Sequence, residues 1–353
     1  MTGNFHQIIK TMRVNGLAIL LVLLAAGCAG YYRGPVSDHF DGRRFDNPWS
    51  PMPNRFGQFL KWRLTGERGP WPESVAVAPT VPPARVAGEE LRVTYVGHAT
   101  VLLQTGGLNI LTDPIWSDRA SPVSFAGPRR VAAPGVRFED LPPIDLVLVS
   151  HNHYDHMDLP TLERLHRAFA PLVLTPLGND AILRSAVPGM RVEALDWGQA
   201  HAVGPQARVT LTPMQHWSAR GLFDRMEALW GAFVIESPGG PVYFLADAGY
   251  AAHLSADIVA RFGTPRLSLL PVGAYEPQWF MSYAHMTPAE AVRTFLDLGQ
   301  GLAMGHQHEV FAMADEAYDA PRRDLGEALR AAGVNPARFL LPRVGEWFTA
   351  PPR

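Results

Sequence analysis

Short apolar runs separated by glycine- and proline-containing turns dominate residues 91–345. The runs at residues 91–96, 101–104 and 108–113 are rich in leucine and β-branched residues, and Gly106-Gly107 separates the last two. Such runs, bounded by turn residues, predict strands, and the glycine pair predicts a hairpin. Further runs of this kind predict strands at residues 144–149, 172–175, 209–215, 242–246 and 302–305.

Between these runs the apolar residues change to helical spacing. Leu162, Leu165 and Phe169 lie on one face of a helix predicted over residues 159–170. Thr287-Pro288-Ala289-Glu290 fits a capping box with proline at the first helical position, so a helix is expected to begin there. Two further helices are predicted at residues 180–186 and 322–332.

The N-terminus has the pattern of an export signal. Lys10 and Arg13 precede an apolar run at residues 17–26, which is too short to span a membrane comfortably. The run ends in small residues before Cys28 and so resembles a bacterial lipoprotein signal, in which the cysteine is lipidated. A plain signal peptide or an uncleaved anchor is the alternative. Because Ala29 follows rather than aspartate, we expect a lipid anchor in the cell envelope, on the periplasmic side of the outer membrane if the source is Gram-negative.

Composition narrows the classes of function. The chain has 353 residues, of which 47% are hydrophobic, and a formal net charge of −2. It is therefore long enough for a sizeable core, and its charge argues against a nucleic-acid partner. Cys28 is the one cysteine, so no intramolecular disulfide can form.

Metal-ligand chemistry is concentrated at the end of one predicted strand. The run at residues 144–149 leads directly into His151, His153, Asp155 and His156. Imidazole and carboxylate are the usual ligands of zinc and similar ions. This dense spacing at a strand end therefore predicts a metal centre.

Three more predicted strands end in a residue that can bind a metal: His216, Asp247 and His306. Taken alone, a histidine beside a strand is more often a hydrogen-bonded structural residue, and an aspartate there is more often a turn or helix cap. Together with the first cluster, four such endings favour one shared metal site.

The order of these ligands resembles that of the metallo-β-lactamase superfamily over about residues 91–345. Further stretches resemble the N-acylphosphatidylethanolamine-hydrolysing phospholipase D family and its exported bacterial relatives; they include residues 95–100, 111–115, 150–156, 215–217 and 271–281. The resemblance implies an α/β fold, a four-layer αββα sandwich of two sheets with helices on both outer faces. It also implies that the metal site lies at one edge of the sandwich.

The resemblance also assigns the ligands. It implies that one zinc ion is held by His151, His153 and His216, and a second by Asp155, His156 and His306, with Asp247 bridging both.

The last ligand has an alternative. The family usually shows His-Trp-Gly-Thr-Phe at this point, whereas this chain has His306-Gln307-His308-Glu309-Val310-Phe311, so His308 is the second candidate.

Several other residues near the expected site have more than one possible role. His285 matches a family histidine near the reaction centre, or it fixes the loop before the Thr287 helix. Asp155 is expected both to bind metal and to orient the attacking hydroxide. Asp113 and Asp145 are candidates to accept hydrogen bonds from ligand imidazoles, or are turn caps.

The predicted organisation is a lipoprotein-type signal at residues 1–28, an irregular proline-rich segment at 29–90 and a hydrolase domain at 91–345. The predicted function is a zinc-dependent phosphodiesterase of the phospholipase D type, in which a metal-bridging hydroxide attacks phosphorus. Its partners would be a phospholipid or other small-molecule substrate and a membrane reached through the lipid anchor. A lactone, ester or other phosphodiester hydrolase of the same fold and a non-catalytic envelope lipoprotein are the alternatives.

Overall fold

The computed structural model describes residues 30–53, 55–205 and 207–353. The predicted signal segment and Cys28 lie outside these residues, so lipidation stays a prediction. Within the described part of the chain, no helix is both long and apolar enough to cross a membrane.

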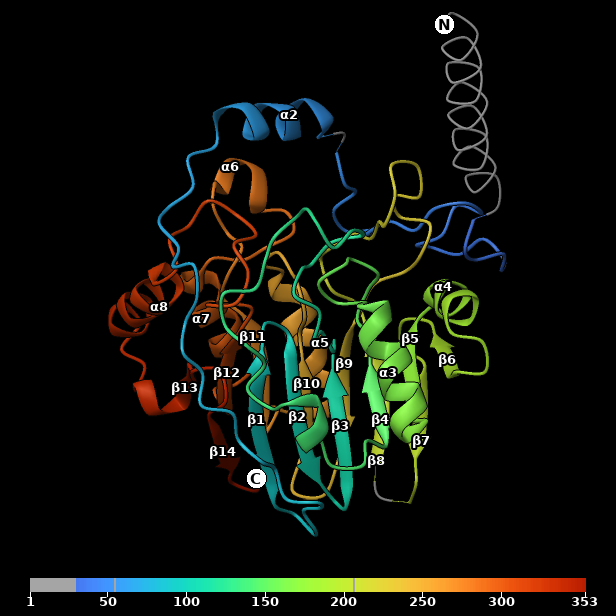
Figure 1. Cartoon of the computed structure of the whole chain (residues 1–353), viewed down its shortest axis with the longest axis vertical. Coiled ribbons are helices and arrows are strands. Elements are labelled where there is room, and N and C mark those ends of the chain that lie inside the picture. The colour runs from blue at the N-terminus through green and yellow to red at the C-terminus, as the bar shows by residue number, and fades with distance from the viewer. Residues whose placement is uncertain (1–29, 54, 206) are drawn as a thin grey trace, which may run out of the picture.

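Two mixed β-sheets pack face to face, and helices cover both outer faces (Figure 1). The first sheet has the order β14-β1-β2-β3-β4-β5-β6, formed by Trp347–Ala350, Leu91–Gly97, Thr100–Thr105, Leu108–Thr112, Leu146–Leu148, Leu172–Pro176 and Arg191–Leu195. The second has the order β13-β12-β11-β10-β9-β8-β7, formed by Phe339–Leu340, Leu302–His306, Leu267–Pro271, Val242–Phe244, Ala232–Glu236, Ala207–Thr212 and Ala200–Val203.

The helices form the two outer layers. The helices α3 and α4 lie on the first sheet, and α5, α7 and α8 lie on the second. Their bounds are Leu159–Phe169, Asn179–Ala186, Ala252–Phe262, Pro288–Asp297 and Ala320–Ala331. Two short 3-10 helices, Phe138–Asp140 and Pro336–Arg338, lie in loops. This is the predicted four-layer αββα fold, and it is confirmed.

The buried strands have apolar residues on both faces. On β3, Ile110 packs between the two sheets, while its neighbour Leu111 packs under the helices with Leu162 and Leu165 of α3. Because each sheet is covered on both faces, its strands contain continuous apolar runs rather than an alternation with polar residues. This explains why the runs in the sequence identified the strands.

The segment after residue 54 contains a helix that the sequence did not predict. The expectation was an irregular segment, but it contains α2, Phe56–Thr65, which is followed by an extended stretch along the domain. None of the residues of α2 is buried, so the apolar side chains of its sequence do not form a core-facing stripe. A sequence pattern without such a stripe gives no strong helix signal.

The predicted capping box is present at the N-terminus of α7. The Thr287 side chain accepts a hydrogen bond from the Glu290 main-chain N–H, and the Glu290 side chain accepts one from the Thr287 main-chain N–H. Met286 N donates to the carbonyl oxygen of Ala248 at 2.8 Å. The start of α7 is therefore fixed beside the loop that follows β10.

Candidate metal centre

The candidate ligands gather at one edge of the sandwich because the strands that carry them run in the same direction. The strand β3 is parallel to β4, and β10 is parallel to β11 and β12. Asp113, His151 and Asp247 follow the carboxyl ends of β3, β4 and β10. This edge therefore receives polar side chains from both sheets.

Three imidazoles converge on one point. His151 Nε2 lies 2.8 Å from His153 Nδ1, which lies 3.3 Å from His216 Nε2. A tetrahedral ion with ligand nitrogens at about 2.0–2.1 Å holds those nitrogens roughly 3.4 Å apart. The spacing is therefore close to that of nitrogens that share one metal ion.

Hydrogen bonds at the far side of two of these rings set their tautomers. His216 Nδ1 lies 3.0 Å from the carbonyl oxygen of Ala284, which can only accept, so Nδ1 carries the proton. Ser150 Oγ donates to Asp113 Oδ2 at 2.6 Å and therefore accepts from His151 Nδ1 at 2.8 Å. In the neutral rings, Nε2 of both His151 and His216 then presents a lone pair to the shared point.

Burial keeps these three rings neutral. Burial and the neighbouring histidines lower the pKa of His151 well below its usual value. Burial likewise lowers the pKa of His216 well below its usual value and that of His153 to about 4. Neutral imidazole is the form that binds metals, so the group is ready to do so near neutral pH.

A second group lies beside the first and is built from one imidazole and two carboxylates. His156 Nδ1 donates to Asp113 Oδ2 at 2.7 Å, so its Nε2 faces Asp155 Oδ2 at 3.1 Å and Asp247 Oδ2 at 3.2 Å. A lone pair directed at two carboxylates is unfavourable unless a positive charge lies between them.

The pKa shifts of His156 and the two carboxylates also indicate that positive charge is favoured between them. Burial lowers the pKa of His156, but Asp247 and Asp155 outweigh it and raise that pKa well above its usual value. The positive field of His156 in turn holds the pKa values of Asp155 and Asp247 well below their usual value, against the effect of burial. A divalent cation bound between His156 and the two carboxylates would supply this positive charge.

Asp113 links both groups. Besides the His156 ring, it accepts the main-chain N–H of Ser150 at 2.7 Å and the Ser150 hydroxyl, which touches His151. Asp113 therefore orients rings in both groups, as expected.

Asp145, the other candidate, contacts no ligand imidazole among the described residues, so this one of its two predicted roles is wrong. It precedes β4 and lies at the opposite end of the strand. There it pairs with Arg85 and accepts the main-chain N–H of Asn109 at 2.8 Å.

The last predicted ligand is not brought into either group. His306 ends β12 as predicted and is fully buried, but its Nε2 lies 2.8 Å from the carbonyl oxygen of Leu245. Its Nδ1 has no hydrogen-bond partner among the described residues.

The alternative, His308, also lies apart from both groups. Its ring stacks on Tyr95 at a centroid distance of 5.1 Å, and its Nδ1 is 3.6 Å from Glu309 Oε2. The structure therefore unites neither candidate with Asp155 and His156.

His285 borders the site where it opens to solvent. Its Nδ1 lies 3.8 Å from Asp247 Oδ2 and has no hydrogen-bond partner within the described chain. Its side chain is 16% exposed, whereas those of His151 and His216 are buried. Since His153 is also partly exposed, the solvent-facing side of the centre lies between His153 and His285.

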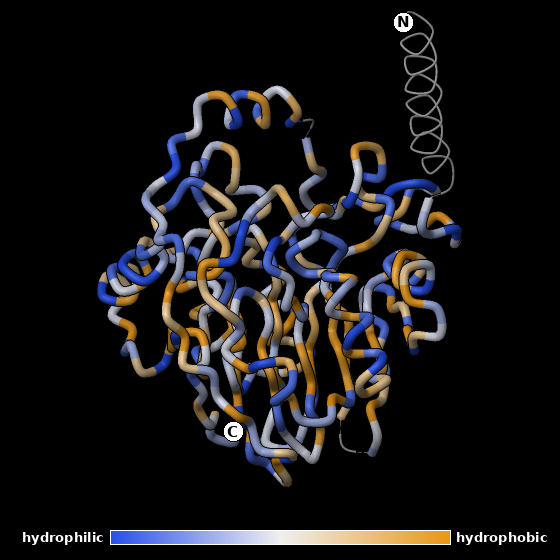
Figure 2. Tube along the Cα trace, viewed as in Figure 1, coloured by the Kyte–Doolittle hydropathy of each residue, from blue (hydrophilic) through white to orange (hydrophobic). Residues whose placement is uncertain are grey.

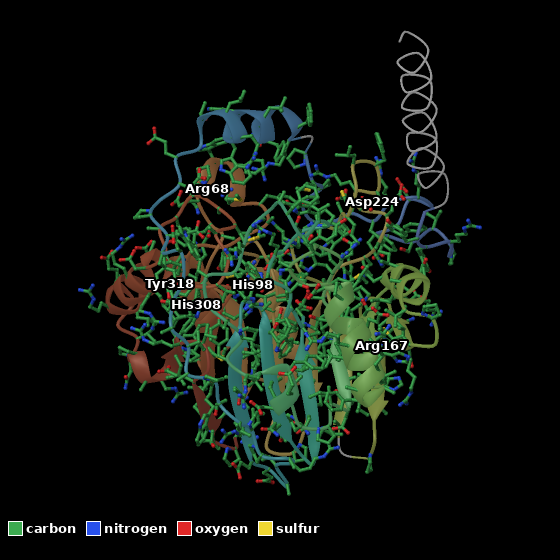
Figure 3. All side chains as sticks on the ribbon, viewed as in Figure 1. Arg68, His98, Arg167, Asp224, His308 and Tyr318 are labelled. Carbon is green, nitrogen blue, oxygen red and sulfur yellow. The ribbon has the colours of Figure 1, made fainter. Side chains whose placement is uncertain are left out.

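His98 belongs to the site but was missed in the sequence. Its Nε2 lies 2.9 Å from Asp155 Oδ2, and together with His156 these residues form a cluster able to hold a metal. Figure 3 shows it at the upper end of the strands, in the turn between β1 and β2. The signal was present in Gly97-His98, a turn directly after a strand, but a single turn histidine carries little information about metal binding.

The residues present fit metal ions. The site offers convergent lone pairs, two adjacent carboxylates and a buried His153 Nε2 that has no hydrogen-bond partner among the described residues. These are the donors that first-row divalent cations take. Such a donor set can support metal-assisted hydrolysis.

Comparisons with known proteins agree with this geometry. The family model described as Beta-lactamase superfamily domain matches residues 108–306. The N-acyl-phosphatidylethanolamine-hydrolyzing phospholipase D 1 of Caenorhabditis elegans is 32% identical over 337 residues, covering 89% of this chain and 94% of that protein. An uncharacterized protein of Mycobacterium tuberculosis is 38% identical over 260 residues, covering 72% of this chain and 68% of that protein.

Solved structures share the fold. The isothiocyanate hydrolase from Delia radicum gut bacteria superimposes with a TM-score of 0.60 at 22% identity, covering 74% of this chain and 99% of that one. At this identity the likeness shows the fold alone.

Proposed function

Since the chain belongs to the metallo-β-lactamase superfamily and is homologous to N-acyl-phosphatidylethanolamine-hydrolyzing phospholipase D proteins, we propose that it is a dinuclear zinc phosphodiesterase that cleaves phospholipids of this kind. The products would be phosphatidic acid and an N-acylethanolamine. That the protein is a metal-dependent hydrolase follows from its family and from the donor clusters.

The observation that carries the proposal is the paired arrangement of donors. His151, His153 and His216 would hold one ion, and Asp155 and His156 the second. Asp247 Oδ2 lies 3.2 Å from His156 Nε2 and 3.9 Å from His216 Nε2, which suits a carboxylate between two ions. His306 remains our proposed last donor of the second ion, since its Nδ1 is buried without a partner among the described residues.

Two ions held in this way would make a water acidic enough to supply hydroxide near neutral pH and would polarise the phosphoryl oxygens. The protein must keep the donors unprotonated and correctly turned. Asp113 turns the His156 ring so that its Nε2 faces the site, and the Ala284 carbonyl turns the His216 ring in the same way. His98 donates to Asp155 Oδ2, the oxygen that also faces His156 Nε2, and thereby holds this carboxylate in place.

His285 is proposed as a proton-transfer residue. Burial lowers the pKa of His285, which keeps the ring neutral despite the nearby Asp247. Its Nδ1 has no hydrogen-bond partner among the described residues, so the neutral ring can accept a proton there from an attacking group. The same atom can then return the proton to a leaving alkoxide.

The test is product analysis with purified, zinc-loaded protein. N-acylphosphatidylethanolamine in mixed micelles is offered in one arm and a panel of lactones and carboxylic esters in the other. We expect equal amounts of phosphatidic acid and N-acylethanolamine from the first arm. Lactone turnover without phosphatidic acid would contradict the phospholipase proposal and favour the alternative hydrolase.

Two variants test whether the hydrolysis depends on bound metal. Asp247→Asn keeps the shape of the side chain but removes its charge, and His153→Ala removes one donor nitrogen. Both are expected to lose bound zinc and at least about 100-fold of the activity. Full activity in either variant after metal removal would refute the metal-dependent mechanism.

A further inference from the structure

A cleft of about 610 Å³ lies at the end of the sandwich opposite the metal centre. It is bordered by the residues that precede β11 and β12 and by the stretch that follows β14, which ends at the letter C in Figure 1. Because His306 ends β12, the whole length of this strand separates the cleft from that residue. A cleft of this size suits a small molecule, and it is distinct from the metal centre.

Positive charge is concentrated in this cleft. Arg266, Arg338 and Arg353 line it, and among the described residues no aspartate or glutamate does. The chain as a whole has a formal net charge of −2. Figure 2 shows hydrophilic residues beside the C-terminus at this end, below the largely hydrophobic strands. The cleft is therefore a basic site in a weakly acidic protein.

Arg266 is the buried member of this set, with an exposed fraction of 3%. Its guanidinium donates to the main-chain carbonyl oxygens of Pro238, Ala350 and Pro351, at 2.5–3.2 Å. Burial lowers the pKa of Arg266, and the charge of Glu89 raises it in part. Since none of the three hydrogen-bond partners is a carboxylate, they hold the guanidinium in place without neutralising it.

The other two arginines lie close to Arg266. A Cβ atom placed at Gly240 would lie 3.3 Å from the Cβ atoms of both Arg266 and Arg353, so these side chains begin side by side. Arg338 Nη2 donates to the carbonyl oxygen of Gly301 at 2.9 Å. A Cβ atom placed at Gly301 would in turn lie 3.6 Å from the main-chain oxygen of Arg266. The three guanidinium groups are therefore held around one cleft by neighbouring main chain.

The two outer arginines keep donors for a ligand. Among the described residues, Arg338 Nη1 and both Nε and Nη2 of Arg353 have no hydrogen-bond partner. None of the three arginines forms an ion pair within the described chain. Arg338 and Arg353 are exposed, so their side chains can turn these N–H groups into the cleft. An anion there would offset the repulsion between like charges.

We infer that this cleft binds a small molecule that carries a phosphate monoester, at a site separate from the metal centre. The guanidinium fork matches phosphate oxygens and binds them through two parallel hydrogen bonds. A phosphate monoester carries a charge of about −1.5 to −2 near pH 7, so it offsets more of the positive charge than a carboxylate does. Leu302, Leu340 and Phe348 also line the cleft and offer apolar surface to the rest of such a molecule.

The test is isothermal titration calorimetry of the purified protein with glycerol 3-phosphate, and with acetate as a carboxylate for comparison. We expect glycerol 3-phosphate to bind and acetate to bind at least about tenfold more weakly. No binding of glycerol 3-phosphate, or equal binding of both anions, would overturn the inference.

His153→Ala shows whether the ligand lies at the metal centre, because it removes a donor there and leaves the cleft intact. This variant should bind glycerol 3-phosphate as the parent does. Loss of binding in His153→Ala would assign the ligand to the metal centre and contradict a separate site.

Arg338→Gln and Arg353→Gln test the cleft itself. Both residues are exposed, whereas Arg266 is buried and holds three carbonyl groups, so the outer pair can be changed with the fold retained. Each variant should weaken the binding of glycerol 3-phosphate about tenfold, because it loses a charge-assisted hydrogen bond. Binding at parental affinity in both variants would refute the site.

The matched control is Arg330→Gln, which makes the same change in net charge outside the cleft. Arg330 is exposed on α8 and donates to the carbonyl oxygen of Gly326 at 3.2 Å. It should bind glycerol 3-phosphate as the parent does. Equal weakening in Arg330→Gln would show that net charge alone is responsible, and the inference would fail.

A further titration distinguishes a lipid phosphate from a soluble one. The probe is dioctanoyl phosphatidic acid, kept below the concentration at which it forms micelles. If the apolar wall of the cleft receives acyl chains, this lipid should bind at least about tenfold more tightly than glycerol 3-phosphate, and Arg338→Gln should weaken that binding. Equal affinities of the two probes, both weakened by Arg338→Gln, would identify a soluble phosphate ester as the ligand.

Discussion

Asn47 donates a hydrogen bond from Nδ2 to the main-chain carbonyl oxygen of His216, at 2.9 Å. The same amide group donates to the Tyr283 hydroxyl at 2.8 Å, and Asn47 Oδ1 accepts from Trp230 Nε1 at 3.1 Å. Asn47 is fully buried and lies outside the residues matched by the family model. The N-terminal segment therefore takes part in holding a predicted ligand.

Replacing Asn47 should destabilise the protein. Asn47→Ala leaves the His216 carbonyl and the Trp230 N–H without this partner in a buried site, which should cost about 3 kcal/mol of unfolding free energy. Urea unfolding followed by tryptophan fluorescence measures the loss. The control is Asn335→Ala, an exposed cap that accepts from Ala337 N and should cost less than about 1 kcal/mol. Equal losses in both variants would contradict the anchoring role.

His98→Asn should weaken the second metal site selectively. Asparagine tolerates the left-handed backbone at this position, where φ is 58°, so the variant tests the imidazole rather than the turn. We expect affinity for the second ion to fall about 10- to 100-fold while the first is retained. Chelator competition and metal content after dialysis measure this.

The matched control for that variant is His253→Asn, at a histidine that contacts Trp49 at a ring distance of 5.4 Å and touches no candidate ligand. It should keep both ions. Two ions bound with parental affinity by His98→Asn would refute the role of His98.

Asp113→Asn should weaken both sites together. The amide would present N–H groups to donors that now meet a carboxylate, so the His156 ring and Ser150 would both lose their orientation. We expect about a 10- to 100-fold loss of affinity for each ion in the same titrations. Asp145→Asn, at the opposite end of β4, should leave both affinities unchanged. Selective loss of one ion in Asp113→Asn would show that Asp113 serves one site only.

His39 should make stability depend on pH. Burial lowers the pKa of His39, but hydrogen bonds to Asp196 and Asp38 outweigh it and raise that pKa above 6.5. A raised folded-state pKa gives stability that is fully present below the unfolded value and is lost as the pH rises through the folded value. His39→Gln should therefore lose about 2 kcal/mol at about pH 5.5 and clearly less at about pH 8.5. A loss independent of pH would rule out the charged pair.

The strands and the metal cluster could be predicted because each has a local cause. Burial on both faces makes every residue of β4 apolar, and the dense ligand motif lies within one loop. The capping box of α7 is equally local. By contrast, the position of Asp145 at the far end of β4 depends on which strand end faces the site, and the flanking sequence alone did not indicate this.

Other features depend on contacts between distant parts of the chain. His98 joins the site through Asp155, which lies far along the sequence and on another strand end. The strand β14 pairs with β1 from the opposite end of the domain, and α2 contacts the short helix α6 (Gln278–Met281) and Asp315. No local pattern encodes such partners, so the sequence did not predict them.

The donor groups are divided between the two sheets. The donors between residues 98 and 156 follow strands of the first sheet. The donors His216 and Asp247 follow strands of the second sheet. A bound ion would thus cross-link two parts of the chain that are far apart in sequence, and it would bind the folded form in preference to the unfolded one. The free metal concentration around the protein would then govern its lifetime against unfolding and proteolysis, so metal starvation would lower its abundance as well as its activity.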